Sequence, residues 1–338
     1  MTRDAAIVQV TRGGVVESIH RVSAAVVDAH GRLVAHLGDP QMLTFFRSAA
    51  KPFQALPLVA DGVVDAYEMT DAELAVCCAS HSGEPAHVEV VVSLLKRIGC
   101  GEADLECGAH PPVHKPSAEA LQREGRVPGP IHNNCSGKHA GMLAWSRHHG
   151  VETAGYRRID HPVQVRIAHA IASWTGTRIS QLKTVIDGCG VVTFAEPLNG
   201  MAGAFARLLA AALSDPTSPP GRVVRAMTGK PYYAGGTGRI STRLMEVTGG
   251  RLLAKYGAEA VMCMAERESG LGLALKIEDG AKRAVGPAVV ELLTQLDLLT
   301  TAERQELDDR HTEPVTNTRG EVVGEIGPSF RVRREGGS

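Results

Sequence analysis

A serine and a lysine three residues apart are the first candidates for chemistry in this sequence. Ser48 and Lys51 stand in the segment Arg-Ser-Ala-Ala-Lys-Pro, which follows a run of predicted strands. In a helix, this spacing places both side chains on one face, about one turn apart. A serine hydroxyl is a poor nucleophile at neutral pH, and a neutral lysine within hydrogen-bond reach can act as its base. Because chance often supplies Ser-x-x-Lys, the pair by itself indicates acyl transfer and nothing finer.

A second serine and lysine have the same potential. Ser80 lies in a small, polar stretch that breaks an apolar segment, where a side chain can face a cleft. Lys255 lies between Leu-Leu-Ala and a tyrosine. Burial among apolar residues lowers the pKa of a lysine and makes a neutral amine available. The alternative for Lys255 is a surface lysine whose stem packs on apolar neighbours while its charge stays in water.

Two cysteines in glycine-containing stretches are candidate thiolates. With Lys138, His139 and Asp187, Cys135 and Cys189 are candidates to enclose a metal such as zinc, which favours cysteine and histidine. The spacing is not a standard zinc pattern, and a lysine ligand must lose its proton against an unperturbed pKa of ~10.4. The polar stretch around Cys135 is equally well explained as a cap on the helix that follows it.

Composition narrows the functional class. The chain has 338 residues, 43% hydrophobic and 22% charged, which is typical of a globular protein with a substantial core. A net charge of −1 and 4% aromatic residues do not fit nucleic-acid binding. The glycine-rich stretch 232–239 matches neither familiar phosphate-binding pattern.

We expect a cytoplasmic protein without a membrane segment. The N-terminus has no signal-peptide pattern, and the most apolar long stretch, 201–213, is interrupted by Arg207 and is too short to cross a bilayer. Seven cysteines are an odd number in a chain of this length, so free thiols are favoured over a disulfide framework.

The predicted elements begin with strands. Residues 5–10, 15–20, 22–28 and 33–37 read as an antiparallel meander, and residues 44–58 as a helix carrying Ser48 near its N-terminus. Unpaired N–H groups there favour an oxyanion or an anionic substrate group. Further helices are expected at 70–78, 87–98, 140–146, 162–174, 198–213, 223–227 and 240–248.

Strands return near the C-terminus. They are expected at 250–255, 260–265, 271–277, 321–326 and 329–334, with a helix at 284–299. Strands at both ends most simply pair in one mostly antiparallel sheet. The predicted fold is mixed α/β in one domain, 1–338, with a sheet lobe (1–60 and 250–338) and a helix-rich lobe (61–249) across a cleft.

Several motifs, in order, resemble the rhizobial-type L-asparaginase II family. They are Ser-Ala-Ala-Lys-Pro at 48–52, Cys-Ala-Ser-His-Ser at 78–82, Asn-Cys-Ser-Gly-Lys-His at 134–139, Asp-Gly-Cys at 187–189, Ala-Gly-Gly-Thr-Gly-Arg at 234–239 and Lys-Ile-Glu-Asp-Gly at 276–280. The resemblance runs from about residue 8 to about residue 333. It implies a fold like that of serine β-lactamases, penicillin-binding proteins and glutaminases, usually as a homodimer.

The resemblance also implies roles for single residues. Ser48 is the implied nucleophile with Lys51 beside it, and Ser80 with Lys255 matches a second serine-lysine pair. Cys135, Lys138 and Cys189 match the family's zinc ligands, whereas Arg47, His139 and Asp187 line the substrate pocket. The chain lacks the Lys-Thr-Gly of the lactamase pattern before its last strands, so the donor to the substrate carboxylate stays open.

The activity implied is hydrolysis of L-asparagine to L-aspartate and ammonia through a serine acyl-enzyme. A glutaminase or a β-lactam hydrolase on the same scaffold is the alternative among enzymes. A non-catalytic amino-acid-binding protein is the alternative from another class, but it would be expected to have lost the nucleophile, and both serine-lysine pairs are intact.

Overall fold

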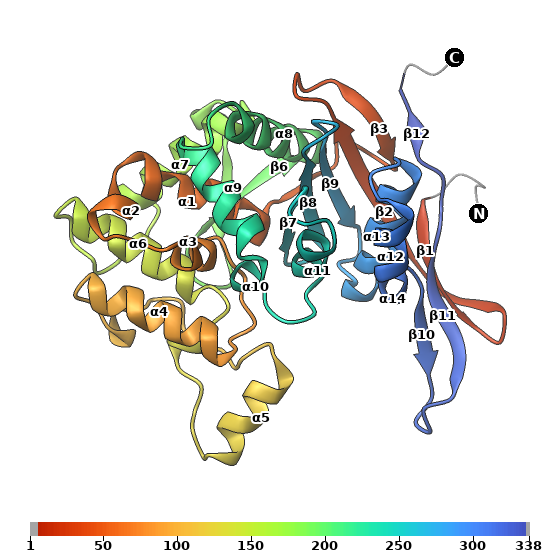
Figure 1. Ribbon diagram of the computed structural model, residues 1–338, viewed down its shortest axis with the longest axis horizontal. Coiled ribbons are helices and arrows are strands. Elements are labelled where there is room, and N and C mark those ends of the chain that lie inside the picture. Colours follow the sequence, from red (N-terminus) through yellow and green to blue (C-terminus); the bar gives the residue numbers. More distant parts are fainter. Residues whose placement is uncertain (1–5, 336–338) are drawn as a thin grey trace. The chain divides into compact units, whose positions relative to one another are not determined.

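The protein is described here by a computed structural model that places residues 6–335 (Figure 1). Ala5, the first residue of the strand predicted at 5–10, lies outside the described residues. The chain divides into two compact units. Unit 1 holds residues 1–44, 196–207 and 243–338, and unit 2 holds residues 45–195 and 208–242. Ser48 and Lys51 therefore belong to unit 2.

Unit 1 is built on one antiparallel sheet. The strand order along its main path is β10-β11-β1-β2-β9-β8-β7, with β3 pairing both β2 and β12. The strands are β1 (Ile7–Arg12), β2 (Val15–Val27), β3 (Leu33–Leu37), β7 (Leu252–Gly257), β8 (Val261–Glu266), β9 (Gly272–Ile277), β10 (Glu313–Thr316), β11 (Val322–Ser329) and β12 (Arg333–Arg334). Because β1 pairs with β11, with Val10 opposite Ile326, the prediction that strands from both ends of the chain share a sheet is confirmed.

The long strand β2 corrects the prediction of two strands at 15–20 and 22–28. Its first half pairs with β1, where Ile7 lies opposite Arg21, and its second half pairs with β3 on the same side. Arg21 is exposed between buried His20 and Val22, as the alternation of one continuous strand requires. The second half of β2 is buried on both faces.

Helices cover the sheet and complete unit 1. Helix α12 (Val285–Gln295) packs against β1 and β11, and its buried residues include Val289, Leu292 and Leu293. Figure 1 shows α12 lying over these strands beside α13 (Thr301–Glu306) and α14 (Asp308–His311). Helix α12 ends at Gln295, four residues before the predicted end at 299.

Unit 2 is helical and packs around α1 (Lys51–Ala60). Every residue of α1 from Lys51 to Val59 is buried, as expected for a helix enclosed on all sides. Its neighbours are α6, α7 and α9 (Figure 1). The other helices of unit 2 are α2 (Val63–Ala66), α3 (Asp71–Cys77), α4 (Pro85–Arg97), α5 (Lys115–Arg123), α6 (Ser136–His148), α7 (Pro162–Thr175), α9 (Pro219–Gly229) and α10 (Pro231–Ala234).

Helix α3 leads into the segment that carries Ser80. It begins with the predicted capping signature, because Thr70 accepts a hydrogen bond from the Glu73 N–H and the Glu73 carboxylate accepts one from the Thr70 N–H. Helix α6 lies close to its end. A Cβ on Gly137 would overlap the Val76 carbonyl, so only glycine permits this approach.

Several short elements were absent from the predictions, among them β4 (Leu43–Phe45), β6 (Val192–Pro197) and α5. Strands β4 and β6 form a small sheet with β5 (Lys183–Ile186), and α5 is amphipathic but short. Helix α8 (Leu198–Ser214) and α11 (Ile240–Val247) agree with the predictions within a residue or two. Within residues 6–335, no helix is both long and apolar enough to cross a membrane. The chain is thus mixed α/β with an antiparallel sheet, as predicted.

Candidate active site

Ser48 lies in a tight turn of helix directly before α1. Residues Arg47–Ala50 form a 3₁₀ helix, and the Lys51 N–H donates to the Ser48 carbonyl. Because a 3₁₀ helix has three residues per turn, it stacks Ser48 and Lys51 on one side, which is the expected relation. Arg47 has a φ of +49°, in the left-handed region that non-glycine residues rarely adopt. Strained backbone therefore precedes the candidate nucleophile.

The Lys51 ammonium is buried, and it bonds Ser80 instead of Ser48. It donates to the Ala79 carbonyl, to Ser80 Oγ at 3.0 Å and to Cys135 Sγ at 3.1 Å. Lys51 is 1% exposed. An ammonium has three protons, so these three acceptors use all of them. Lys51 thus joins the start of α1 to the segments that carry Ser80 and Cys135.

The segment 79–84, here called the Ser80 loop, is buried, has no regular secondary structure and joins α3 to α4. The His81 N–H donates to the Asn134 carbonyl at 3.1 Å, and the Ser82 carbonyl accepts from the His114 N–H at 2.8 Å. The His81 ring accepts from the Gly83 N–H and therefore donates through Nε2 to Ser136 Oγ, 2.9 Å away. These bonds fix the loop against the N-terminus of α6.

Arg47 forms an ion pair with Asp187. Arg47 Nε lies 2.7 Å from Asp187 Oδ1, and the two side chains are 24% and 11% exposed. Burial alone would raise the pKa of Asp187, but the charge of Lys138, the Gly188 N–H and Arg47 outweigh it and hold that pKa below its usual range. The turn that carries Asp187 also carries Cys189, since the Gly190 N–H donates to the Asp187 carbonyl. The ion pair links this turn to the residue before Ser48.

Two thiols and an amine converge beside Lys51. Lys138 Nζ lies 3.1 Å from Cys189 Sγ, and the Cys135 and Cys189 side chains hydrogen-bond each other. The bond from Cys135, with the charge of Lys138, lowers the pKa of Cys189 to about 4 in spite of burial. The same bond and burial raise the pKa of Cys135 to about 12.

This donor set fits zinc, with one requirement. Within residues 6–335, no three His, Cys, Asp or Glu side chains are grouped to hold a metal, and Lys138 Nζ is the further donor that lies beside the thiols. Nearby thiolates raise the pKa of the Lys138 ammonium, although burial opposes this, and a metal must displace its proton. Two thiolates and an amine are donors that Zn²⁺ accepts. The polar stretch around Cys135 could also have served as a cap on the helix that follows. The Cys135 side chain does not do so, because among the described residues it makes no cap hydrogen bond to α6.

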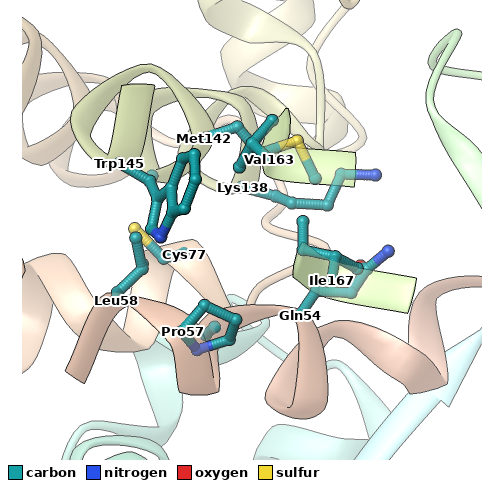
Figure 2. A pocket seen from close by; sticks show the side chains of 11 residues that line it. Gln54, Pro57, Leu58, Cys77, Lys138, Met142, Trp145, Val163 and Ile167 are labelled. Carbon is teal, nitrogen blue, oxygen red and sulfur yellow. The ribbon is translucent and has the colours of Figure 1, made fainter. Parts of the chain in front are cut away.

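Lys138 reaches this cluster from the interior of unit 2. Its stem lines a cavity of about 10 Å³ between α1, α6 and α7, together with Gln54, Cys77, Trp145 and Ile167 (Figure 2). Figure 2 shows the amino group pointing away from Trp145. A volume of this size holds about one water molecule, so the cavity is a packing gap and not a substrate site.

His139 has one ring nitrogen without a partner. His139 Nδ1 lies 2.6 Å from the Tyr156 hydroxyl, which itself accepts from the Glu106 N–H at 2.8 Å. His139 Nδ1 and the Tyr156 hydroxyl therefore share one hydrogen bond, and the tautomer of the ring decides which of the two donates. Burial and the charge of Lys138 lower the pKa of His139 to about 3, so the ring is neutral. Within residues 6–335, Nε2 has no hydrogen-bond partner.

Tyr156 and Glu106 were absent from the sequence predictions. They lie 50 residues apart in sequence, in loops without periodicity, and neither belongs to a recognisable motif. The available signal was weak: Tyr156 is one of only five tyrosines and stands in a polar, glycine-containing loop.

Lys255 lies in unit 1, apart in sequence from the other candidates. It is on β7 opposite Cys263 of β8, is 1% exposed, and donates to the Tyr256 carbonyl at 2.8 Å. Of the two alternatives for Lys255, a buried lysine and a surface lysine, the structure shows the buried one. Its pairing with Ser80 stays a prediction. The other nine candidates all belong to unit 2.

Comparisons with known proteins follow this geometry. The sequence model of a family described as L-asparaginase II matches residues 8–328, from β1 to β11. No curated protein sequence matches the chain.

Two solved structures are similar to the chain. One is a β-lactamase from Mycobacterium bovis, with 17% identity, 86% of this chain and 95% of that chain covered, and a TM-score of 0.37. The other is a probable glutaminase from Bacillus subtilis complexed with 6-diazo-5-oxo-L-norleucine, with 14% identity, 82% and 84% covered, and a TM-score of 0.38. The mixed α/β assignment rests on the sheet and helices of the chain itself.

Proposed function

Because the chain belongs to the L-asparaginase II family, a family of amidohydrolases, we propose that it hydrolyses L-asparagine to L-aspartate and ammonia. The family match over residues 8–328 carries this proposal. The contacts of Lys51 with Ser80 and Cys135, and of Arg47 with Asp187, all within unit 2, support it.

Ser48 is the proposed nucleophile. Its hydroxyl oxygen attacks the side-chain amide carbon, the C–N bond breaks, and a β-aspartyl ester forms with release of ammonia. Water then hydrolyses the ester and returns the serine. N–H groups at the start of α1 are the proposed donors to the oxyanion, and in known enzymes one such donor contributes ~3–4 kcal/mol.

The proposed base is the second serine-lysine pair, Ser80 with Lys255. Lys51 contacts the Ala79 carbonyl, Ser80 Oγ and Cys135 Sγ, so it holds Ser80 in place and is the alternative base. The base takes the proton of Ser48 and returns one to the leaving ammonia. Loss of turnover in Lys255→Met, with Ser48 unchanged, is the expected result.

Zinc is proposed as the resident metal, held by Cys135, Lys138 and Cys189. When bound, it supplies positive charge that orients the α-amino and α-carboxylate ends of the substrate. Arg47, Asp187 and His139 Nε2, which has no hydrogen-bond partner within residues 6–335, are the proposed polar contacts to those ends. On the family resemblance alone, we also propose a homodimer that works in the cytoplasm.

Ammonia release from asparagine, with and without added zinc, tests the function. Glutamine and a chromogenic β-lactam, assayed in parallel, separate the asparaginase from the other two hydrolases. Binding of asparagine without ammonia release would identify an amino-acid-binding protein. Ser48→Ala should abolish turnover while the melting temperature stays near that of the wild type, and near-normal activity in this variant would refute Ser48 as the nucleophile.

A further inference from the structure

The glycine-rich stretch 232–239 has no role in the proposed chemistry, yet it forms three hydrogen bonds with the Ser80 loop. Ser82 Oγ donates to the Gly235 carbonyl at 3.2 Å. The Thr237 N–H donates to Glu84 Oε1 at 2.8 Å, and Thr237 Oγ1 donates to Glu84 Oε2 at 2.7 Å. Both partners of each bond belong to unit 2. Two hydroxyls, one N–H and one carboxylate therefore join the loop to this stretch.

Glu84 is committed to this contact. It is the N-cap residue of α4, where a side chain normally bonds the first free N–H groups, but among the residues that the structure describes it makes no such cap. Instead, the 6% exposed carboxylate reaches Thr237 with both oxygens. Burial would raise the pKa of Glu84, but the two bonds from Thr237 outweigh it and lower that pKa. The carboxylate is thus an ionised acceptor.

The glycines make the approach possible. Gly236 has a φ of +123°, and a Cβ there would lie 2.7 Å from both Ser82 Cβ and Glu84 Oε1. Such a distance is a clash, so only glycine lets the backbone lie flat against the loop. Thr237 is exposed, in contrast, so its side chain can be changed without opening the core. The two hydrogen bonds from Thr237 to Glu84 are called the Thr237–Glu84 clip, and Thr237 forms its exposed side.

We propose that Glu84 and Thr237 are positioning residues for Ser80. The Ser80 loop is held by Asn134 at His81, by His114 at Ser82, and by the Thr237–Glu84 clip at its far end. Loss of the clip frees the end nearest α4 and lets the Ser80 hydroxyl leave its 3.0 Å contact with Lys51. The inference rests on the proposed function, in which Ser80 moves the proton of Ser48.

Thr237→Val and Thr237→Ser test the clip. Valine keeps the shape and the N–H but removes the hydroxyl donor, whereas serine keeps the donor. Thr237→Val is expected to lower kcat for asparagine about 5- to 20-fold, with KM changed less than about twofold, and Thr237→Ser to stay within about twofold of the wild type. Hydrogen exchange at the N–H groups of residues 81–84 is expected to rise in the valine variant and to return in the serine variant.

Thr300→Val is the matched control. Thr300 caps α13 in unit 1, where its Oγ1 accepts from the Glu303 N–H at 3.2 Å. This variant loses one threonine hydroxyl that accepts from the backbone N–H of a glutamate. Its melting temperature should fall about as much as that of Thr237→Val, whereas kcat should stay unchanged. Equal losses of kcat in both variants would assign the effect to stability and overturn the proposal.

Other outcomes are equally decisive. A rise in KM alone would make Thr237 a substrate contact, and unchanged exchange at 81–84 would show that the clip does not order the loop. In a Ser80→Ala background, Thr237→Val should have no further effect on the residual rate, and full additivity would refute action through Ser80. If the wild type releases no ammonia, the proposed function fails, while the exchange data still decide whether the clip holds the loop.

Discussion

Removing the carboxylate of Asp187 should disturb the backbone that presents Ser48. Arg47 holds a φ of +49°, which costs a non-glycine residue ~1–2 kcal/mol. The Arg47 side chain forms an ion pair with Asp187, in which Nε lies 2.7 Å from Oδ1. With Asp187→Asn the charge attraction is lost while the side chain keeps its shape, so the backbone at Arg47 can relax and carry Ser48 with it.

The magnitude follows from the exposure of the pair. At 24% and 11% exposed, it lies between a surface pair, worth ~0–1 kcal/mol, and a buried one, whose disruption costs ~3–5 kcal/mol. We expect Asp187→Asn to lower the free energy of unfolding by about 1–3 kcal/mol. We expect kcat to fall about 10- to 100-fold, because a displaced nucleophile loses ~1.4–2.7 kcal/mol of transition-state stabilisation.

A double-mutant cycle with Arg47→Gln is the assay. Urea unfolding and steady-state ammonia release are measured for both single variants and for the double variant. The effects should be strongly non-additive in both measurements. If the two single effects add within ~0.5 kcal/mol, the Arg47–Asp187 ion pair does not hold the backbone before Ser48. A large rise in KM with kcat intact would instead make them direct contacts to the substrate.

The pH dependence of the cycle has a definite sign. The pKa of folded Asp187 lies below its ordinary value of 3.8, so the carboxylate favours the folded state above that pH. This contribution is lost as pH falls through the folded pKa. The stability difference between the wild type and Asp187→Asn should therefore be constant from pH 5 to 7 and shrink below about pH 3.8.

Three further predictions concern the same cluster. Lys51→Met should abolish turnover and cost about 2–4 kcal/mol of unfolding free energy, because a buried carbonyl and a hydroxyl lose their donor; Lys276→Met in unit 1, which deprives the Glu259 and Ile277 carbonyls, should cost a similar amount and leave kcat unchanged. Tyr156→Phe should cost about 1–2 kcal/mol by urea unfolding, since the Glu106 N–H and His139 lose a partner, and an unchanged midpoint would contradict the network. Cys189→Ser should lower the zinc content found by metal analysis, whereas Cys107→Ser should not, and equal content in both would remove Cys189 from the ligand set.

The fold could be predicted where the sequence repeats a local pattern. The capping box Thr70-x-x-Glu73 marked the start of α3 correctly, and short apolar runs bounded by glycine or charged residues marked β7, β8 and β9. Strand β6 and helix α5 were missed, because one is a short run buried from Val192 to Ala195 and the other has only Leu121 buried. Neither contains enough turns of its period to stand out from a loop.

The candidate site was predictable only in part, and for a different reason. Family motifs named Ser48, Ser80 and Cys135, but the bonds that arrange them join segments far apart in sequence. Lys51 reaches Cys135 across 84 residues, and Thr237 reaches Glu84 across 153. Such contacts depend on the packing of whole helices, which no local periodicity encodes. The positive φ of Arg47 is likewise a tertiary constraint, since arginine has no preference for it.

Two buried lysines with several acceptors, Lys276 and Lys51, differ in the kind of group that they contact. Lys276 donates to backbone carbonyls of Glu259, Ile277 and Glu278, groups that cannot exchange a proton, so its role is to close the end of β9. Lys51 has one carbonyl among its acceptors, but the other two are the Ser80 hydroxyl and the Cys135 thiol. Both of these can give up a proton, and a fixed positive charge beside them stabilises the anion that remains. We therefore expect Lys51 to act through Ser80 and Cys135, and the reactivity of Ser48 to depend on where those two groups lie.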